Sequence, residues 1–375
     1  MTPTAQPSIV SSFTKENVCL KISKSGELYT AIVPIPSFTS KQVLIHIKCT
    51  GVCGSDIHLW KEGGIGDMRI EDDLIIGHET AGQIIAVGAD VTHDLKVGDR
   101  VAIEPQLPCG QCFLCMNGNY NLCQEVDFLG MPNMNGSMQR YLPFDPKFCH
   151  KLPDNISYEE GALAEVFSVA YHGIERAGGL ELGKGAMIAG CGPIGLATLL
   201  LANSSGAYPL AVTDISQERL DFAKVLVPSV KTYKLDMKLS VRENAEKIRA
   251  LFGTTEYEMP PNVLECTGVA SSINTCCYVV RRKGTLTVIG VSGKNEIDGF
   301  PFMTVSFGEV DIKFVNRYKD SWPAVLNLFA SRKVDALKFV THRIPLETAP
   351  EALKTFYNPS IRSMKVMVKD DINLL

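Results

Sequence analysis

The chain has 375 residues, of which 45% are hydrophobic and 21% charged, and its formal net charge is −4. This length predicts two domains with large cores, so no disulfide or metal is needed merely to hold a small fold together. The slight excess of negative charge argues against a nucleic-acid partner, because such proteins present a basic face to phosphate.

The first part of the chain, to about Glu165, predicts an irregular domain built mostly of β-strands. Short β-branched runs occur at Gln42 to Lys48, Gly82 to Val87 and Asp99 to Ile103. Glycine and proline separate these runs, which is typical of strands joined by turns. We therefore expect residues 1–166 to form a mainly β domain.

After Gly185 the pattern changes to strands alternating with helices, which predicts a doubly wound parallel sheet. We place this α/β domain at residues 167–315 and expect residues 316–375 to return to the first domain. The predicted strands are Ala186 to Ala189, Leu210 to Thr213, Val230 to Lys234, Val263 to Cys266 and Thr285 to Ile289. The predicted helices are Ile194 to Ser204, Gln217 to Leu226, Val241 to Phe252 and Ser271 to Val280.

The chain shows neither a secretory signal nor a membrane span. Residues 1–10 lack a basic residue followed by an apolar core. The longest uncharged apolar stretch, Ala186 to Ala202, has glycines and a proline near its middle, which favours a strand, a turn and a helix. We expect a cytoplasmic protein with no membrane partner.

A glycine-rich motif predicts a dinucleotide site. Gly190, Gly192 and Gly195 form G-C-G-P-I-G between a predicted strand and helix, where they allow a tight turn and close approach to a pyrophosphate. Asp214 ends the next predicted strand, and an acid there binds the adenosine ribose and repels a 2′-phosphate. The motif therefore favours NAD, the alternative being a glycine-rich turn without a ligand. Arg219 either stacks on adenine or is a solvated helix residue.

Four clustered cysteines predict a structural zinc site. Cys109, Cys112, Cys115 and Cys123 have the spacing C-x2-C-x2-C-x7-C, which suits a closed tetrahedral site. An iron–sulfur cluster is an alternative, but the long last gap and the absence of a following proline favour zinc. Four free thiols at this spacing are the remaining alternative.

A second, looser set combines a thiol, an imidazole and a carboxylate. Cys53 lies in G-V-C-G-S-D-I-H, and His78 and Glu79 lie in G-H-E. Such a mixed donor set suits a catalytic zinc with one open position. Spacing alone leaves open a hydrogen-bonded core histidine and a buried, apolar cysteine.

These motifs, together with G-H-E-T-A-G, V-G-D-R-V-A-I-E-P, G-A-L-A-E, L-E-C-T-G-V and V-T-H-R, resemble the zinc-containing medium-chain alcohol dehydrogenases over nearly the whole chain. The likeness is to the sorbitol, xylitol and L-arabinitol dehydrogenase branch. V-D-F-L-G from Val126, G-K-N-E-I from Gly293 and F-V-T-H-R-I-P-L-E from Phe339 resemble the fungal L-arabinitol 4-dehydrogenases.

The resemblance implies a GroES-like catalytic domain, a Rossmann NAD-binding domain and a homotetramer with two zinc ions per chain. It implies oxidation of a polyol secondary alcohol to a ketose, with hydride transfer to NAD. L-arabinitol to L-xylulose, a step of L-arabinose catabolism, is the implied reaction. Xylitol and sorbitol are alternative substrates, and a catalytically inactive NAD-binding sensor or structural protein is the alternative of another class.

The resemblance also assigns residues. Cys53, His78 and Glu79 would be the catalytic zinc ligands, with Glu165 near the fourth position, either as a ligand or holding the bound water. Ser55 and His58 would relay the alcohol proton to solvent, unless Ser55 caps a helix and His58 is a surface residue. The NAD contacts would be the three glycines with Pro193, Ile194, Asp214, Arg219, Ile289, Val291, Val315, Asn316 and Arg317. The substrate contacts would be Glu165, Leu59, Arg317 and Tyr318.

Some residues depart from the branch near the expected substrate cleft. Leu59 stands where sorbitol dehydrogenases place a tyrosine, and Val166 and Phe167 replace the usual proline and leucine. Asn316, Lys319 and Asp320 also differ from the usual residues around Arg317 and Tyr318. These departures bear on the identity of the substrate and leave the reaction class unaffected.

Overall fold

The computed structural model describes residues 16–291 and 296–371. Contacts divide the chain into a first unit, residues 1–165 with 339–375, and a second unit, residues 166–338. The predicted motif from Gly293 and the predicted absence of a signal in residues 1–10 fall wholly or largely outside the described residues. No helix in the described chain is long and apolar enough to cross a membrane.

The return to the first unit comes later than the expected residue 316. Helix α9 (Trp322–Ala330) groups with the second unit. Its Phe329 ring lies 4.9 Å from the ring of Phe167 in an edge-to-face arrangement, and both side chains are fully buried. This aromatic packing joins α9 to the middle of helix α3 (Tyr158–Ala177).

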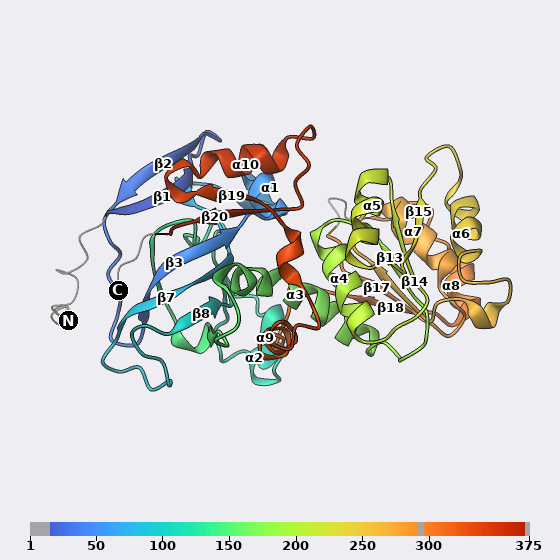
Figure 1. Cartoon of the computed structure of the whole chain (residues 1–375), viewed down its shortest axis with the longest axis horizontal. Helices are drawn as coiled ribbons and strands as arrows, with labels where there is room; N and C mark the ends of the chain where they lie inside the picture. Colours follow the sequence, from blue (N-terminus) through green and yellow to red (C-terminus); the bar gives the residue numbers. More distant parts are fainter. Residues whose placement is uncertain (1–15, 292–295, 372–375) are drawn as a thin grey trace. The chain divides into compact units, whose positions relative to one another are not determined.

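The main sheet of the first unit combines strands from both ends of the chain (Figure 1). Its centre is the long pair of β3 (Val43–Gly51) and β7 (Glu79–Val87), and β20 (Lys365–Lys369) from the returning segment pairs with β3 on the other side. The remaining strands are β8 (Arg100–Ile103), β12 (Cys149–Lys151), β11 (Tyr141–Phe144) and β19 (Val340–Pro345). A smaller sheet has the order β2 (Leu28–Val33), β1 (Asn17–Ile22) and β6 (Leu74–Ile75).

Two short helices complete the hydrophobic core of the first unit. Helix α1 (Gly54–Glu62) contributes Leu59, and helix α10 (Pro350–Tyr357) contributes Leu353, both at 0% exposure. They share one buried cluster with side chains of β1 and β20. The strands that the sequence predicts in this unit are present, with β3 extending to Gly51 and β7 beginning at Glu79.

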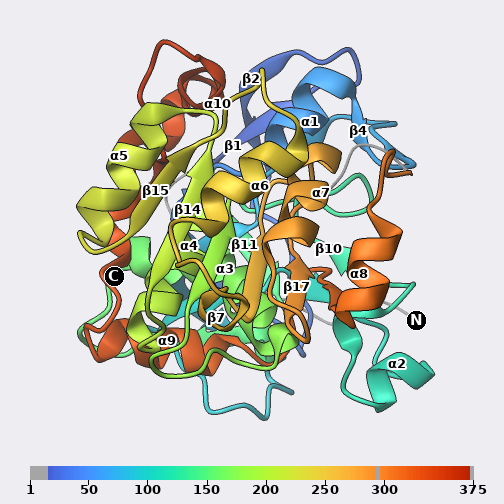
Figure 2. The same cartoon turned by 90° about the vertical axis from the view of Figure 1, so that its right-hand side faces the viewer.

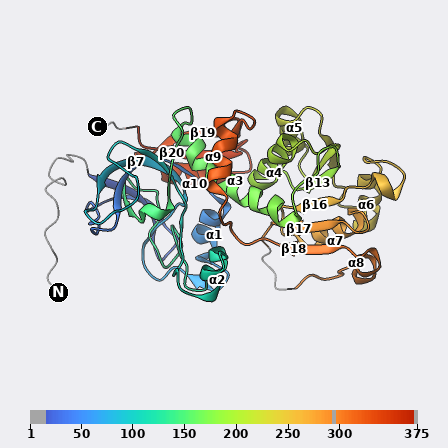
Figure 3. The same cartoon turned by 90° about the horizontal axis from the view of Figure 1, so that it is seen from below.

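The second unit is the predicted doubly wound fold (Figures 2 and 3). Helices α4 (Pro193–Ser204) and α5 (Gln217–Leu226) cover one face of a parallel sheet, and α6 (Val241–Arg249) and α7 (Ala270–Val279) cover the other. The strand order is β15 (Lys231–Lys234), β14 (Leu210–Asp214), β13 (Ala186–Ala189), β16 (Asn262–Glu265), β17 (Thr285–Val288) and β18 (Asp311–Phe314). The order reverses between β13 and β16, which is where such sheets bind ligands.

Candidate metal and coenzyme sites

Strand pairing brings the two halves of the mixed donor set together. Gly51 at the end of β3 lies opposite Glu79 at the start of β7, so Cys53 and His78, one or two residues away, become neighbours. One ligand atom each of Cys53, His78 and Glu79 lies within 4.8 Å of the others. The sheet register therefore produces the cluster that spacing alone left open.

The carboxylate of Glu79 is held by a buried cation that the sequence analysis did not identify. Lys365 on β20 donates from Nζ to both Glu79 carboxylate oxygens, at 2.8 and 2.7 Å, and to the carbonyl of Val52 at 3.1 Å. Both charged residues are 1% exposed. Burial alone would lower the pKa of Lys365, but the neighbouring Glu79 and Cys53 raise it above its usual value.

The imidazole of His78 faces a buried acid. His78 Nδ1 and Asp56 Oδ1 are 3.8 Å apart, and neither has a hydrogen-bond partner within the described residues. The other Asp56 oxygen accepts from the backbone N–H of Cys53 at 2.9 Å. A histidine that binds metal through one ring nitrogen commonly donates to a carboxylate through the other. This pair of unsatisfied atoms therefore fits a metal-binding histidine.

The charges around His78 also fit a cation site. Burial alone would lower the pKa of His78, but the neighbouring Cys53, Asp56 and Glu165 raise it to about 10. The cluster thus collects more acidic groups than the one lysine balances. Zinc accepts such a mixture of sulfur, nitrogen and oxygen donors.

The other residues predicted for this site have different surroundings. Glu165 is 6% exposed and close enough to affect the pKa values of His78 and Lys365. Ser55 Oγ lies 3.4 Å from His78 Nε2, and α1 has Cys53 as its N-cap, so Ser55 does not cap this helix. His58 is exposed, and its Nδ1 lies 2.8 Å from Glu62 Oε1.

Leu59 does not occupy the expected position on a cleft wall. Its side chain has 0% exposure and belongs to the hydrophobic core cluster of the first unit. On helix α1, Leu59 follows directly after the exposed His58, so this part of the helix turns from solvent towards the core. The implied contact between Leu59 and the substrate therefore has no support in the structure.

The four-cysteine loop forms a compact sulfur cluster. The four Sγ atoms of Cys109, Cys112, Cys115 and Cys123 lie within 4.8 Å of one another, and no disulfide joins cysteines in residues 16–291, where all twelve lie. A hydrogen bond from the backbone N–H of Cys115 lowers the pKa of Cys112 to about 7. Burial and neighbouring thiols raise the pKa of Cys115 to about 12. Four crowded thiols fit a bound cation that would stabilise their thiolates.

The glycine-rich turn has the shape that a pyrophosphate requires. Gly190 has a φ of +96°, and a Cβ on Gly195 would overlap the carbonyl of Gly190. A Cβ on Gly192 would meet nothing within 4 Å, so this backbone is open to approach. Pro193 and Ile194 form the first turn of α4, whose N-terminus favours negative charge.

Asp214 is fixed beside this turn. Its Oδ2 accepts from the backbone N–H of Cys191 at 2.8 Å, and its Oδ1 accepts from that of Ser216 at 2.8 Å. Asp214 is 6% exposed, whereas Arg219 is exposed on α5. The carboxylate therefore lies at the carboxyl end of β14, as the ribose contact requires.

The remaining predicted coenzyme and substrate residues follow β17 and β18. Ile289 is 5% exposed and Val291 is 85% exposed, while the backbone N–H of Val315 bonds to the carbonyl of Val288. Arg317 and Asp320 have φ values of 55° and 47°, which non-glycine residues rarely adopt. Tyr318 is 0% exposed, and its ring lies 6.0 Å from that of Trp322, so this side chain is buried where a substrate contact was expected. Asn316 is exposed and Lys319 half-buried.

Comparisons with known proteins agree with this architecture. Residues 39–154 match the family model of the alcohol dehydrogenase GroES-like domain, and residues 193–331 match that of zinc-binding dehydrogenase. L-arabinitol 4-dehydrogenase of Aspergillus niger is 45% identical, covering 88% of this chain and 86% of that protein. Sorbitol dehydrogenase of Gallus gallus is 38% identical, covering 96% and 98%.

Among solved structures, L-idonate 5-dehydrogenase of Escherichia coli superimposes with a TM-score of 0.83 at 25% identity, covering 95% of this chain and 99% of that one. The GroES-like and coenzyme-binding parts both match, and the relatives extend over nearly the whole chain. The chain belongs to the zinc-binding alcohol dehydrogenase family and is an NAD-dependent polyol oxidoreductase.

Proposed function

We propose that the protein oxidises L-arabinitol to L-xylulose with NAD. The observation that carries the reaction class is the Cys53, His78 and Glu79 cluster, with its unsatisfied His78 nitrogen, in a chain that also has the phosphate turn and Asp214. The substrate rests on the similarity to fungal L-arabinitol 4-dehydrogenases, at 43–45% identity.

Each residue near the cluster has a proposed part in the reaction. Cys53, His78 and Glu79 would hold a zinc ion, which supplies Lewis-acid polarisation of the alcohol oxygen. The hydroxyl of Ser55 lies 3.4 Å from His78 Nε2 and would accept the alcohol proton. The exposed imidazole of His58 would release that proton to water. Glu165 would either ligate the metal or hold a water at the fourth position.

We also propose two zinc ions per chain, the second held by the four cysteines. The crowding of these four sulfur atoms supports a closed structural site. Elemental analysis of the purified protein should give close to two zinc ions per chain. A value of one or less in fully active protein would overturn the two-site proposal.

A panel of polyols tests the substrate. With NAD, kcat/KM should be highest for L-arabinitol, lower for xylitol and sorbitol, and very low for ethanol. The second candidate is sorbitol oxidation, which the 38% identity to a sorbitol dehydrogenase favours. If sorbitol gave the highest kcat/KM, the L-arabinitol proposal would fail. If no polyol produced NADH, the chain would instead be an inactive NAD-binding protein.

We propose that the protein assembles as a homotetramer in the cytoplasm. Phe307 on α8 (Phe302–Gly308) is 71% exposed and Phe314 at the end of β18 is 63% exposed, and β18 has no second partner strand in the described chain. Exposed apolar groups beside an unpaired strand edge favour self-association. Light scattering should give four chains per particle, and Phe307→Asp should reduce that number.

The proposed cytoplasmic location has separate support. Twelve cysteines without a disulfide support a reducing compartment.

A further inference from the structure

Glu265 is a fully buried acid in the second unit. It is the last residue of β16, its exposure is 0%, and no lysine or arginine of the described chain forms an ion pair with it. A buried carboxylate without a cation is unfavourable unless hydrogen bonds satisfy its oxygens. The groups that donate hydrogen bonds to Glu265 therefore show which part of the fold this carboxylate holds in place.

All four donors come from the turn that begins helix α7 and from the first residues of that helix. Glu265 Oε1 accepts from the backbone N–H of Thr267 at 2.9 Å, from the Thr267 hydroxyl, and from the Ser272 hydroxyl at 2.8 Å. Oε2 accepts from the backbone N–H of Gly268 at 2.9 Å. The Thr267 hydroxyl in turn accepts from the backbone N–H of Val269 at 3.0 Å. One carboxylate thus fixes the backbone of residues 267–269, which we call the β16 turn.

The β16 turn lies against the glycines at the ends of two neighbouring strands. A Cβ on Gly190, after β13, would lie 2.6 Å from Cγ2 of Thr267. A Cβ on Gly290, after β17, would overlap the backbone N of Gly268. The carbonyl of Glu265 also accepts from the backbone N–H of Gly290 at 3.0 Å. The turn is therefore packed between the ends of β13 and β17, where the strand order reverses.

The strand order indicates which half of the coenzyme this turn faces. Asp214 ends β14, on one side of β13, and an acid there marks the adenosine ribose. β16 and β17 lie on the other side of β13, so the nicotinamide half belongs there. At the ends of these two strands, Val269 and Val291 are 54% and 85% exposed, which provides an apolar surface for a ring.

We propose that Glu265 is a positioning residue for the nicotinamide half of NAD, acting through the β16 turn without touching the coenzyme. The inference rests on the NAD site described above. Glutamine at this position keeps the side-chain size. Its NH2 group, however, is a hydrogen-bond donor and would face N–H or O–H groups that now donate to the carboxylate. The β16 turn then shifts, while the phosphate turn and Asp214 keep their own hydrogen bonds.

The test compares NADH with ADP-ribose, which lacks the nicotinamide, by calorimetric titration of the full-length protein. In Glu265→Gln the Kd for NADH should rise about tenfold, with the Kd for ADP-ribose within about twofold of wild type. Glu258→Gln is a matched control. Glu258 also accepts from backbone N–H groups and a threonine hydroxyl, but it is exposed and lies before β16, at the opposite end of the strand.

The outcomes separate the possibilities. Equal weakening of both ligands would show a purely structural role, and unchanged binding of both would show no role; either result overturns the proposal. If Glu265→Gln does not fold, Ser272→Ala removes one donor and should raise the Kd for NADH alone by about two- to fivefold. If the Ser272 variant raised the Kd for both ligands equally, or for neither, the proposal would also be overturned. If wild type bound neither ligand, the NAD site itself would be wrong.

Discussion

Lys365 and Glu79 form a buried ion pair in which one ammonium group bonds to both oxygens of one carboxylate, at 2.8 and 2.7 Å. Lys365 comes from the last strand of the chain and Glu79 from the proposed metal site. Removing one partner of such a pair leaves an uncompensated charge in the interior. The lysine therefore balances the charge of Glu79 before any metal is bound.

Replacing Lys365 with methionine should affect the metal-free protein most. Breaking a buried pair typically destabilises a protein by about 3–5 kcal/mol, and a bound zinc ion would compensate part of the unpaired, buried charge on Glu79. Urea unfolding with and without zinc measures the difference. Lys369→Met is the control, since Lys369 lies on the same strand and pairs with exposed or partly buried acids. Equal losses with and without zinc would contradict the expectation.

Replacing Cys112 with serine should remove about one zinc ion per chain and lower the thermal stability of the first unit. Its Sγ lies 3.5 Å from that of Cys115 and 4.0 Å from that of Cys123, so its loss opens the sulfur cluster. Elemental analysis and calorimetric melting measure both effects. Cys149→Ser changes a buried cysteine outside the cluster and should keep the full zinc content. An unchanged zinc content in the Cys112 variant would contradict the proposal that the four cysteines hold a structural zinc ion.

Replacing Asp214 with serine should relax the choice of coenzyme. The carboxylate would repel a 2′-phosphate, so its loss should raise the NADP to NAD ratio of kcat/KM about tenfold. Asp221→Ser, which changes an exposed acid one turn into the following helix α5, should leave the ratio unchanged. Equal use of both coenzymes by wild type would show that Asp214 does not discriminate.

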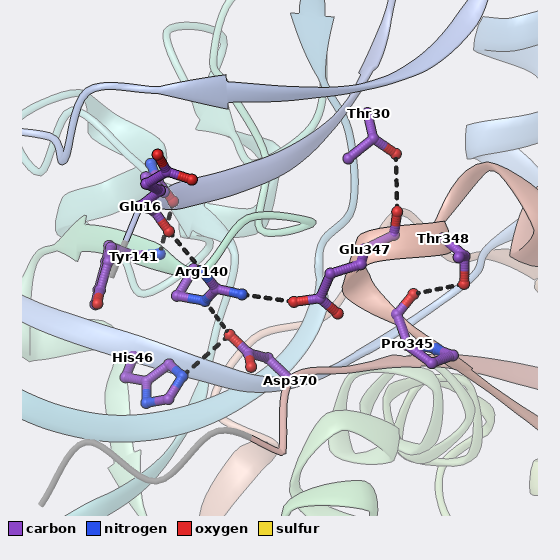
Figure 4. Close-up of polar contacts among 10 residues, drawn as sticks. Glu16, Thr30, His46, Arg140, Tyr141, Pro345, Glu347, Thr348 and Asp370 are labelled. Atoms are coloured by element: carbon purple, nitrogen blue, oxygen red, sulfur yellow. Dashed lines mark hydrogen bonds and ion pairs between the residues drawn. The ribbon is translucent and has the colours of Figure 1, made fainter. Parts of the chain in front are cut away.

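Acid should destabilise the first unit through a buried cluster at its sheet (Figure 4). Asp370 Oδ2 accepts from Arg140 Nε at 2.6 Å and lies 3.2 Å from His46 Nε2. Burial alone would raise the pKa of Asp370, but these two partners hold it at about 2. Burial lowers the pKa of His46 below its usual value.

Both shifts act in the same direction. The unfolded chain takes up protons at Asp370 near pH 4 and at His46 near pH 6.5, before the folded protein does, so acid favours unfolding. The contribution of His46 to the free energy of unfolding should fall as the pH drops through about 6.5. The contribution of Asp370, about 2 kcal/mol, should be lost between about pH 5 and pH 2. Urea midpoints at several pH values measure this. Asp370→Asn should be less stable at pH 7 and show a weaker decline below pH 5; an unchanged decline would contradict the assignment.

The sequence predicts most of the alternating strands and helices of the second unit because these elements carry their own local signals. The strand Ala186–Ala189 and the helix Gln217–Leu226 have the predicted bounds, and the helix expected to reach Phe252 ends three residues early, at Arg249. The other predicted elements differ by one residue at one end or both, and the sequence does not predict α8, β18 or α9. The first unit was harder, since its elements depend on distant partners. Helix α3 was missed although Ser157 and Glu160 form a capping box at its start.

The metal ligands and Lys365 show the same contrast. Cys53, His78 and Glu79 stand in recognisable motifs, so the sequence could propose them. Lys365 lies in an ordinary strand, and its role depends on the pairing of β20 with β3, which no local pattern reveals. Leu59 is expected at the substrate only because of its position in the family resemblance, whereas helix α1 turns its side chain into the core.

The closing of the first unit by residues 339–371 has a consequence for biosynthesis. As the chain leaves the ribosome, β3 has β7 on one side, but the edge that β20 covers stays open until the last strand emerges. The second unit is continuous and can fold before that moment. Until Lys365 arrives, its ion pair with Glu79 cannot form, so the newly made chain depends on residues 339–371 to protect both an open strand edge and an unbalanced acid.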